Sequence, residues 1–184
     1  EMGYASDADI LFVHDPFPDA DEVDAQRLAN EVASQLARLL KETSPEPSMP
    51  VDYDLRPEGR NGPLARSIAS FVEYYERWAD AWEYQSLLRA RPITGDSELA
   101  QEFVTLIDPY RYPARGLPEA SLREIRRIKA RVETERMPRG VLPQRHLKLG
   151  RGCLADVEWT AQLLQLQYAG SHPDMRTTAT LPAL

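Results

Sequence analysis

The hydrophobic pattern of the first part of the chain predicts two strands separated by a helix. Residues 8–13 are apolar beyond their opening, which is typical of a strand buried on both faces. Residues 23–41 carry apolar side chains three and four positions apart, the spacing of an amphipathic helix. Residues 51–56 alternate between apolar and polar side chains and end at Pro57, which predicts a second strand. Two strands joined by a helix indicate a core of both helix and sheet.

Beyond the second strand the pattern becomes helical. Apolar and aromatic residues over 64–82 recur every three or four positions, which predicts one long helix that Pro92 ends. Residues 121–136 open with a Ser-x-x-Glu capping box and predict another helix. Residues 154–170 repeat the helical spacing and end at a glycine. No further strand pattern follows, so we expect the second half to be a bundle of helices.

Composition narrows the classes of function. The net charge of −7 disfavours non-specific binding of nucleic acid, so any site for a polyanion must be local. The single cysteine, Cys153, excludes an internal disulfide and a paired-cysteine metal site and fits a reducing cytoplasm. No apolar run approaches the roughly 18 residues that span a bilayer, and no signal peptide is present. We therefore expect a cytoplasmic protein without nucleic-acid or membrane partners. Because Glu1 lies only a few residues before a strand, we expect a piece of a longer protein.

Two acidic residues mark the opening of the first predicted strand. Asp7 and Asp9 are two positions apart, so both carboxylates would face the same side. Carboxylates beside an apolar strand are costly unless a cation compensates them, and Mg²⁺ prefers carboxylate oxygens, water and phosphates. Asp52 and Asp54 on the second predicted strand can supply a third ligand if the strands are neighbours. Three carboxylates with a nucleoside triphosphate suit two-metal nucleotidyl transfer.

Neighbouring residues could complete such a site. Gly3 and Ser6 precede the acids and offer backbone and hydroxyl donors for phosphate, and Arg56 lies on the predicted carboxylate face. The pattern also has other interpretations. Solvated acids at a strand end would produce it, and glycosyltransferases use Asp-x-Asp with a divalent metal. The carboxylates alone do not choose between these chemistries.

Other charged residues have two interpretations each. Arg60, Lys148 and Arg151 could contact a triphosphate, or they could be surface charges or pair with nearby acids. Glutamates interrupt the basic run at 123–136, which favours a solvated helix face or a protein contact over nucleic acid.

Several separate motifs resemble one known enzyme family. Residues 3–9, Gly-Tyr-Ala-Ser-Asp-Ala-Asp, resemble the signature of polymerase-beta-type nucleotidyltransferases. With them, residues 52–62, 81–91, 148–152 and 154–159 resemble the glutamine synthetase adenylyltransferases, bifunctional enzymes that adenylylate and deadenylylate glutamine synthetase. The resemblance covers essentially the whole chain.

The resemblance implies an α+β fold. A small nucleotidyltransferase-type mixed sheet with flanking helices would occupy residues 1–95, without its N-terminal part. A helical bundle domain, truncated at its C-terminus, would follow at residues 96–184. Family members usually carry Gly-Gly where this chain has Gly152-Cys153, which puts a special backbone angle there in question.

The resemblance also implies a reaction. Asp7 and Asp9 would hold Mg²⁺ or Mn²⁺ with Asp52 as the third acid, and AMP would pass from ATP to a tyrosine hydroxyl of glutamine synthetase. Residues 111–113 and 123–131 look more like the C-terminal, adenylylating half of the family. The alternatives are the half that removes AMP by phosphorolysis, and an inactive fold that serves as a sensor or docking module. The implied partners are glutamine synthetase and a PII-type signal protein.

Overall fold

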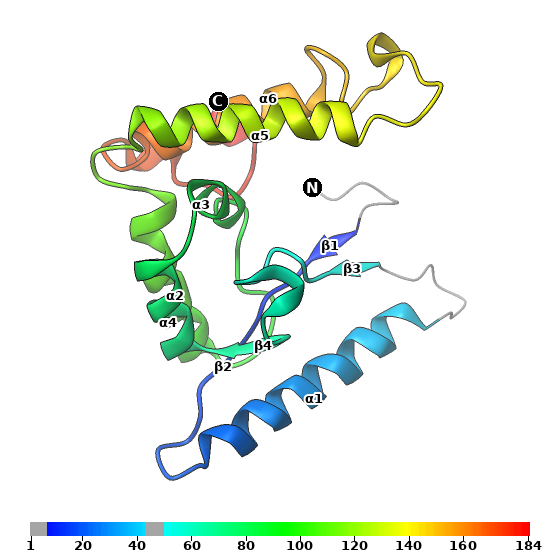
Figure 1. The fold of residues 1–184 in the computed structure, drawn as a ribbon. Helices are drawn as coiled ribbons and strands as arrows, with labels where there is room; N and C mark the ends of the chain where they lie inside the picture. The colour runs from blue at the N-terminus through cyan, green and yellow to red at the C-terminus, as the bar shows by residue number, and fades with distance from the viewer. Residues whose placement is uncertain (1–6, 43–49) are drawn as a thin grey trace. The chain divides into compact units, whose positions relative to one another are not determined.

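The structure, a computed structural model, describes residues 7–42 and 50–184 (Figure 1). The chain divides between Ala79 and Asp80 into two units, each with its own internal contacts. The domain boundary after residue 95 that the resemblance implies stays a prediction. None of the described helices is long and apolar enough to cross a membrane.

The first unit contains two pairs of short parallel strands. Strand β1 (Ala8–Asp9) pairs with β3 (Val51–Asp52), and β2 (Phe12–His14) pairs with β4 (Ala65–Ser67). Helix α1 (Glu22–Lys41) lies between β2 and β3 in the chain (Figure 1). Parallel strands need such a crossover, because a tight hairpin can join only antiparallel strands.

The order of strand, helix and strand confirms the pattern read from the sequence. The single strand predicted at residues 8–13, buried on both faces, was wrong: β1 and β2 pair with different strands, and none of their residues is buried. The combination of helix and sheet is also confirmed. The mixed sheet is not, because both strand pairs in the part of the chain that the structure describes are parallel. The helical crossover is the physical reason for this direction, since it returns the chain to the end of the sheet from which it started.

The second predicted strand is shorter than its alternating pattern suggests. Strand β3 ends at Asp52, whose Oδ1 accepts a hydrogen bond of 2.7 Å from the backbone N–H of Asp54. A turn follows, with a 3.2 Å hydrogen bond from the N–H of Arg56 to the carbonyl of Tyr53. The prediction of a strand through residue 56 was therefore wrong. An aspartate side chain that bonds the backbone two residues ahead competes with the sheet ladder and turns the chain.

Helix α1 is fixed to strand β4 by two polar side chains. Its N-terminus is capped by Asp21, which accepts from the N–H groups of Val23 and Asp24. Gln26 then donates to the carbonyl of Ala65 at 2.6 Å, and the N–H of Ala65 donates to Asn30 at 2.9 Å. These side chains satisfy both backbone groups of one strand residue and hold the helix to it.

The single long helix predicted before Pro92 was wrong. The segment contains strand β4, helix α2 (Ile68–Arg77) and helix α3 (Ala81–Leu87). Ser67 caps α2, and Asp80 opens α3 through a capping box with Glu83. Capping side chains accept from the first N–H groups of a helix, which have no partner within it, and so favour a new helix start at that point. Two helix starts therefore occur within a stretch whose apolar spacing is continuous.

In the second unit three longer helices contact the short helix α3. These are α4 (Ser97–Arg111), α5 (Glu119–Glu135) and α6 (Leu154–Tyr168). The core is made of aliphatic and aromatic residues, and four of them are completely buried: Leu88, Ile125, Leu166 and Ala169. Short 3₁₀ turns occur throughout the described chain: η1 (Gly59–Asn61), η2 (Pro143–Arg145), η3 (Pro173–Met175) and η4 (Leu181–Ala183).

The helical second half is confirmed, with two local corrections. Helix α5 begins at Glu119 after Pro118, so Ser121 lies inside it and the predicted capping box at Ser121 was wrong. Proline just before a helix start supplies a compatible backbone angle without needing a donor. Helix α4, capped by Asp96, was missed. The assembly of these helices as a separate bundle domain stays a prediction.

Candidate functional site

Asp9 and Asp52 are register partners in the first pair of parallel strands. Two ladder bonds flank them, from Ala8 N–H to the Pro50 carbonyl and from Ile10 N–H to the Asp52 carbonyl, both 2.9 Å. Register partners point to the same face of a sheet, and neighbouring strands lie about 4.8 Å apart. The condition set by the sequence analysis, that these strands are neighbours, is therefore met. Asp9 and Asp52, two of the three predicted carboxylates, therefore lie side by side on one face of the β1–β3 pair, although helix α1 separates them in the sequence.

The structure does not place the other predicted site residues beside Asp9 and Asp52. Asp7 precedes β1 and is exposed, while Gly3 and Ser6 lie outside the described residues. Within residues 7–42 and 50–184 no group of three His, Cys, Asp or Glu side chains is close enough to hold a metal ion. Carboxylate oxygens still suit Mg²⁺ or Mn²⁺ by their chemistry. The metal assignment to Asp7, Asp9 and Asp52 stays a prediction.

Arg56 closes the loop that follows Asp52. Its guanidinium donates to the carbonyl of Tyr53 at 2.8 Å and to the carbonyl of Gly62 at 3.2 Å. The side chain is only 14% exposed, so these bonds hold the loop from inside. This is a structural role, and contact with a triphosphate stays a prediction for Arg56.

Arg60 pairs with Asp54 on the same loop. Its Nε and Nη2 atoms lie 2.8 Å and 2.7 Å from Oδ2 of Asp54. The hydrogen bond from Arg60 holds the pKa of Asp54 below its usual value, and in return it raises the pKa of Arg60. The charge of Asp52 also favours protonated Arg60. The loop thus places an exposed guanidinium within the electrostatic influence of the Asp52 carboxylate on β3.

The loop keeps an unusual backbone through an ion pair between an exposed glutamate and a buried arginine. Glu58 and Gly59 both have left-handed backbone angles, with φ of 61° and 54°. For a residue such as Glu58 this angle costs about 1 kcal/mol. Its carboxylate lies 2.6 Å from the buried guanidinium of Arg66, which offsets that cost. A Cβ at Gly62 would lie 2.3 Å from the carbonyl oxygen of Pro57, so only glycine fits there. Sequence reasoning missed Arg66, because its pairing depends on the shape of this turn.

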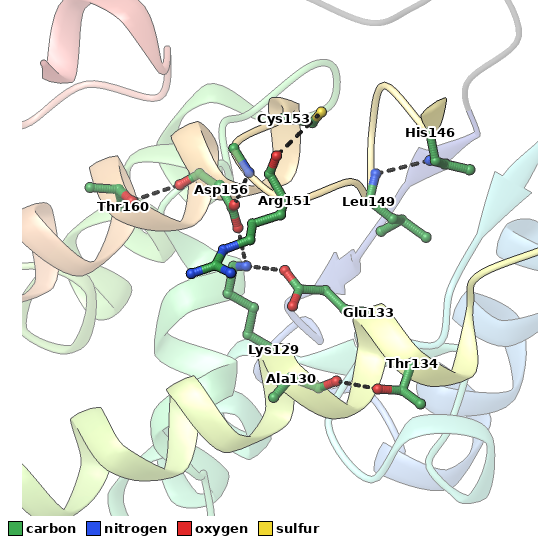
Figure 2. Close-up of polar contacts among 11 residues, drawn as sticks. Lys129, Ala130, Glu133, Thr134, His146, Leu149, Arg151, Cys153, Asp156 and Thr160 are labelled. Atoms are coloured by element: carbon green, nitrogen blue, oxygen red, sulfur yellow. Dashed lines mark hydrogen bonds and ion pairs between the residues drawn. The ribbon is translucent and has the colours of Figure 1, made fainter. Parts of the chain in front are cut away.

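A second group of charges lies at the start of α6, within the second unit. The ammonium group of Lys129 pairs with the carboxylates of both Glu133 and Asp156 (Figure 2). Asp156 also accepts a hydrogen bond from the N–H of Gly152. Burial disfavours charged Lys129, but its hydrogen bonds to the two acids outweigh burial and raise the pKa. The hydrogen bond from Lys129, followed by that from Gly152, lowers the pKa of Asp156. The Asp156 carboxylate therefore has a structural role, which is to join α5 to the turn that precedes α6.

The turn before α6 keeps a special backbone angle. Gly152 has φ of +76°, in the left-handed region, whereas Cys153 has φ of −93°. The doubt raised by the missing second glycine was therefore wrong, since the position that needs glycine is Gly152. The first N–H groups of α6 are also used: those of Leu154 and Ala155 donate to loop carbonyls at 3.1 Å and 3.0 Å.

Replacing Lys129 by methionine is expected to lower the free energy of unfolding by about 2 kcal/mol at neutral pH. The change leaves Glu133 and Asp156 facing each other without a cation. The folded pKa of Asp156 lies below its usual 3.8, so its stabilising effect is present above that pH and is lost as the pH falls through the folded pKa. Chemical unfolding at several pH values should therefore show a difference that is constant near neutrality and shrinks below about pH 4.

Arg123 provides a matched control on the same helix. It pairs with Glu119 one turn away, and both side chains are largely exposed. Exchange of Arg123 for methionine should change the free energy of unfolding by less than about 0.5 kcal/mol. Equal losses at the two positions would contradict a special role for Lys129.

The amino-acid sequence is similar to that of one family of enzymes along its whole length. The sequence model of the family described as glutamate-ammonia ligase adenylyltransferase matches residues 1–105. Three curated relatives carry the name bifunctional glutamine synthetase adenylyltransferase/adenylyl-removing enzyme. They come from Streptomyces avermitilis, Mycobacterium avium and Mycobacterium tuberculosis and are 56%, 54% and 51% identical over the whole chain. The chain spans only 18% of the length of each relative.

Proposed function

The chain belongs to the glutamate-ammonia ligase adenylyltransferase family, and from this premise we propose that it forms part of a nucleotidyl-transfer site. The proposed reaction moves AMP from ATP to a tyrosine hydroxyl of glutamine synthetase. The observation that carries the proposal is the in-register pairing of Asp9 with Asp52, which brings two carboxylates together from separate segments. Glutamine synthetase as partner and the cytoplasm as location are parts of the same proposal.

The paired carboxylates of Asp9 and Asp52 support such a transfer, because carboxylate oxygens are the ligands that Mg²⁺ prefers. The acceptor oxygen would form a bond to the α-phosphorus of ATP, and the bond to pyrophosphate would break. Asp9 and Asp52, with Asp7, would hold Mg²⁺ or Mn²⁺, which when bound would activate the acceptor hydroxyl and offset the charge of the phosphates. Arg60 would add a positive charge beside these carboxylates, and the loop that carries it is held by its own hydrogen bonds.

Removal of AMP is the second candidate. The names of the relatives include an adenylyl-removing activity, and the same carboxylates would serve it. Inorganic phosphate would then attack the phosphorus of adenylyl-tyrosine, the bond from phosphorus to the tyrosine oxygen would break, and ADP and the free tyrosine hydroxyl would be released. The likeness of residues 111–113 and 123–131 to the C-terminal half of the family supports addition of AMP. A PII-type signal protein is the regulator that the resemblance predicts for either direction.

The test uses the whole protein that contains this chain. Incubation with unmodified glutamine synthetase and ATP labelled at its α-phosphate is expected to label the acceptor and release pyrophosphate. A parallel incubation with adenylylated glutamine synthetase and phosphate would yield ADP if the chain belongs to the removing half. A protein that does neither and fails to bind ATP with Mg²⁺ would be the sensor or docking module, and both proposals would be wrong.

A further inference from the structure

The segment between α5 and α6 concentrates positive charge in an acidic protein. Residues 136–153, here called the basic loop, contain no aspartate or glutamate, although the whole chain has a net charge of −7. The loop carries four arginines and one lysine: Arg136, Arg139, Arg145, Lys148 and Arg151. Because the rest of the chain is negatively charged, a negatively charged partner would be attracted to the basic loop and repelled by the other surfaces.

The charges of the basic loop are available to a partner. All five side chains are exposed. No ion pair joins any of them to an acid within residues 7–42 and 50–184, whereas Arg123, Lys129 and Arg131 on α5 are each paired. The positive charge of the loop is thus not neutralised by the described residues.

The basic loop also exposes aliphatic side chains between its charges. Val141, Leu142 and Leu147 are 39%, 56% and 79% exposed. A surface for single-stranded nucleic acid would instead offer large aromatic rings for base stacking, and the loop contains no phenylalanine, tyrosine or tryptophan. Arginine combined with exposed apolar side chains is the composition of a protein interface. The chemistry therefore favours a protein partner with acidic groups around an apolar patch.

The basic loop is held in shape by internal hydrogen bonds. The N–H of Leu149 donates to Nδ1 of His146 at 2.9 Å (Figure 2). The N–H of Gly150 donates to the His146 carbonyl at 2.7 Å. A Cβ at Gly150 would lie 2.5 Å from the carbonyl oxygen of Pro143, so the two backbone segments are packed too closely there for any side chain. The Lys129 and Asp156 pair fastens the base of the loop to α5. A loop already in one conformation loses less entropy when it binds.

We infer that the basic loop is a docking surface for an acidic patch on a protein partner. Resting on the proposed function, we identify this partner as the protein that accepts AMP. Arginine and lysine side chains would meet carboxylates of the acceptor, and Leu142 and Leu147 would be covered by its apolar side chains. The loop would thereby set the affinity for the acceptor, while nucleotide binding would depend on other residues.

The test compares charge reversals in the whole protein, with glutamine synthetase as the varied substrate. Arg139→Glu with Arg145→Glu is expected to raise KM for glutamine synthetase by about tenfold or more. The KM for ATP should change by less than about twofold, because the altered side chains do not touch nucleotide. The difference should shrink at high salt, since exposed charges are screened. A matched pair, Arg115→Glu with Arg126→Glu, reverses two exposed charges elsewhere in the same unit and should leave both KM values unchanged.

A second variant tests the apolar part of the surface. Leu147→Ser is expected to raise KM for glutamine synthetase by about threefold to tenfold, with no change in KM for ATP. A rise in KM for ATP instead of the acceptor would overturn the inference, because the loop would then serve the nucleotide. Equal effects of the two charge-reversed pairs would also overturn it, because the overall charge would then be responsible.

Failure of the proposed function can be told apart from failure of this inference. If the unaltered protein transfers no AMP, direct binding of immobilised glutamine synthetase is measured instead. Loss of binding in the Arg139→Glu and Arg145→Glu protein, but not in the matched pair, would support the docking surface without any catalysis. Unchanged binding in all variants would overturn it.

Discussion

Replacing Asp9 or Asp52 by asparagine is expected to lower the rate of AMP transfer by about a thousandfold. Each change removes one negative charge from the pair that the parallel register brings to one face of the strands. An amide is a much weaker ligand for Mg²⁺ than a carboxylate, so the affinity for the ion and the stabilisation of the phosphates should fall together. The rate is measured as label transferred from α-phosphate-labelled ATP, and metal-dependent ATP binding is measured beside it.

The fold should survive these changes. Asp9 is exposed and asparagine keeps a side-chain oxygen that can accept a hydrogen bond, so its exchange should alter the free energy of unfolding by less than about 1 kcal/mol. The Asp52→Asn variant would keep a side-chain oxygen that accepts from the N–H of Asp54 and would preserve the turn. Asp54→Asn is the matched control, because it removes a carboxylate that Arg60 already holds, and its rate should fall less than about tenfold. Full activity of Asp9→Asn or Asp52→Asn would refute the assignment of this pair.

Replacing Gln165 by leucine is expected to lower the free energy of unfolding by about 3 kcal/mol. Gln165 is completely buried and donates to the carbonyls of Met175 and Thr177, both at 2.8 Å. Its Oε1 also accepts from Arg89 at 3.2 Å. Leucine has a similar volume but would remove all three of these partly buried hydrogen bonds. The melting temperature measured by calorimetry should fall by about 10 °C.

Gln101 is the matched control for this change. It lies on the exposed surface of α4, so leucine there removes no buried hydrogen bond. Its exchange should shift the free energy of unfolding by less than about 0.5 kcal/mol. If the Gln165→Leu protein melted at the same temperature as the Gln101→Leu protein, the buried network would have no net stabilising effect.

Some elements could be predicted because their signals are local. Helices α1 and α6 follow the three-and-four spacing of apolar residues, whereas the alternation over residues 51–56 predicted only where β3 begins. The break between α2 and α3 could not be predicted from that spacing. There the capping box of Asp80 and Glu83 competes with an apolar pattern that continues across it.

The candidate site divides in the same way. The carboxylates Asp7, Asp9 and Asp52 were found from their spacing and from the likeness of their surroundings to a known family. The pairs of Glu58 with Arg66 and of Lys129 with Asp156 were not found. An ion pair leaves no periodic signal in a sequence, because its members need only be brought together by the turns between them.

By itself, the sequence determined the order of strand, helix and strand and the helical second half, and it predicted the acids Asp7, Asp9 and Asp52 for the chemistry. These follow from residue types and from spacings within one or two turns of chain. Only the tertiary structure decided that Asp9 and Asp52 are register partners and that β3 stops at Asp52. Both outcomes depend on a strand meeting its neighbour after a helical crossover, and on one side chain turning toward the backbone. Periodicity contains neither. The register is set by contacts between segments that folding brings together, and the end of β3 is set by a hydrogen bond from the Asp54 N–H to the Asp52 side chain.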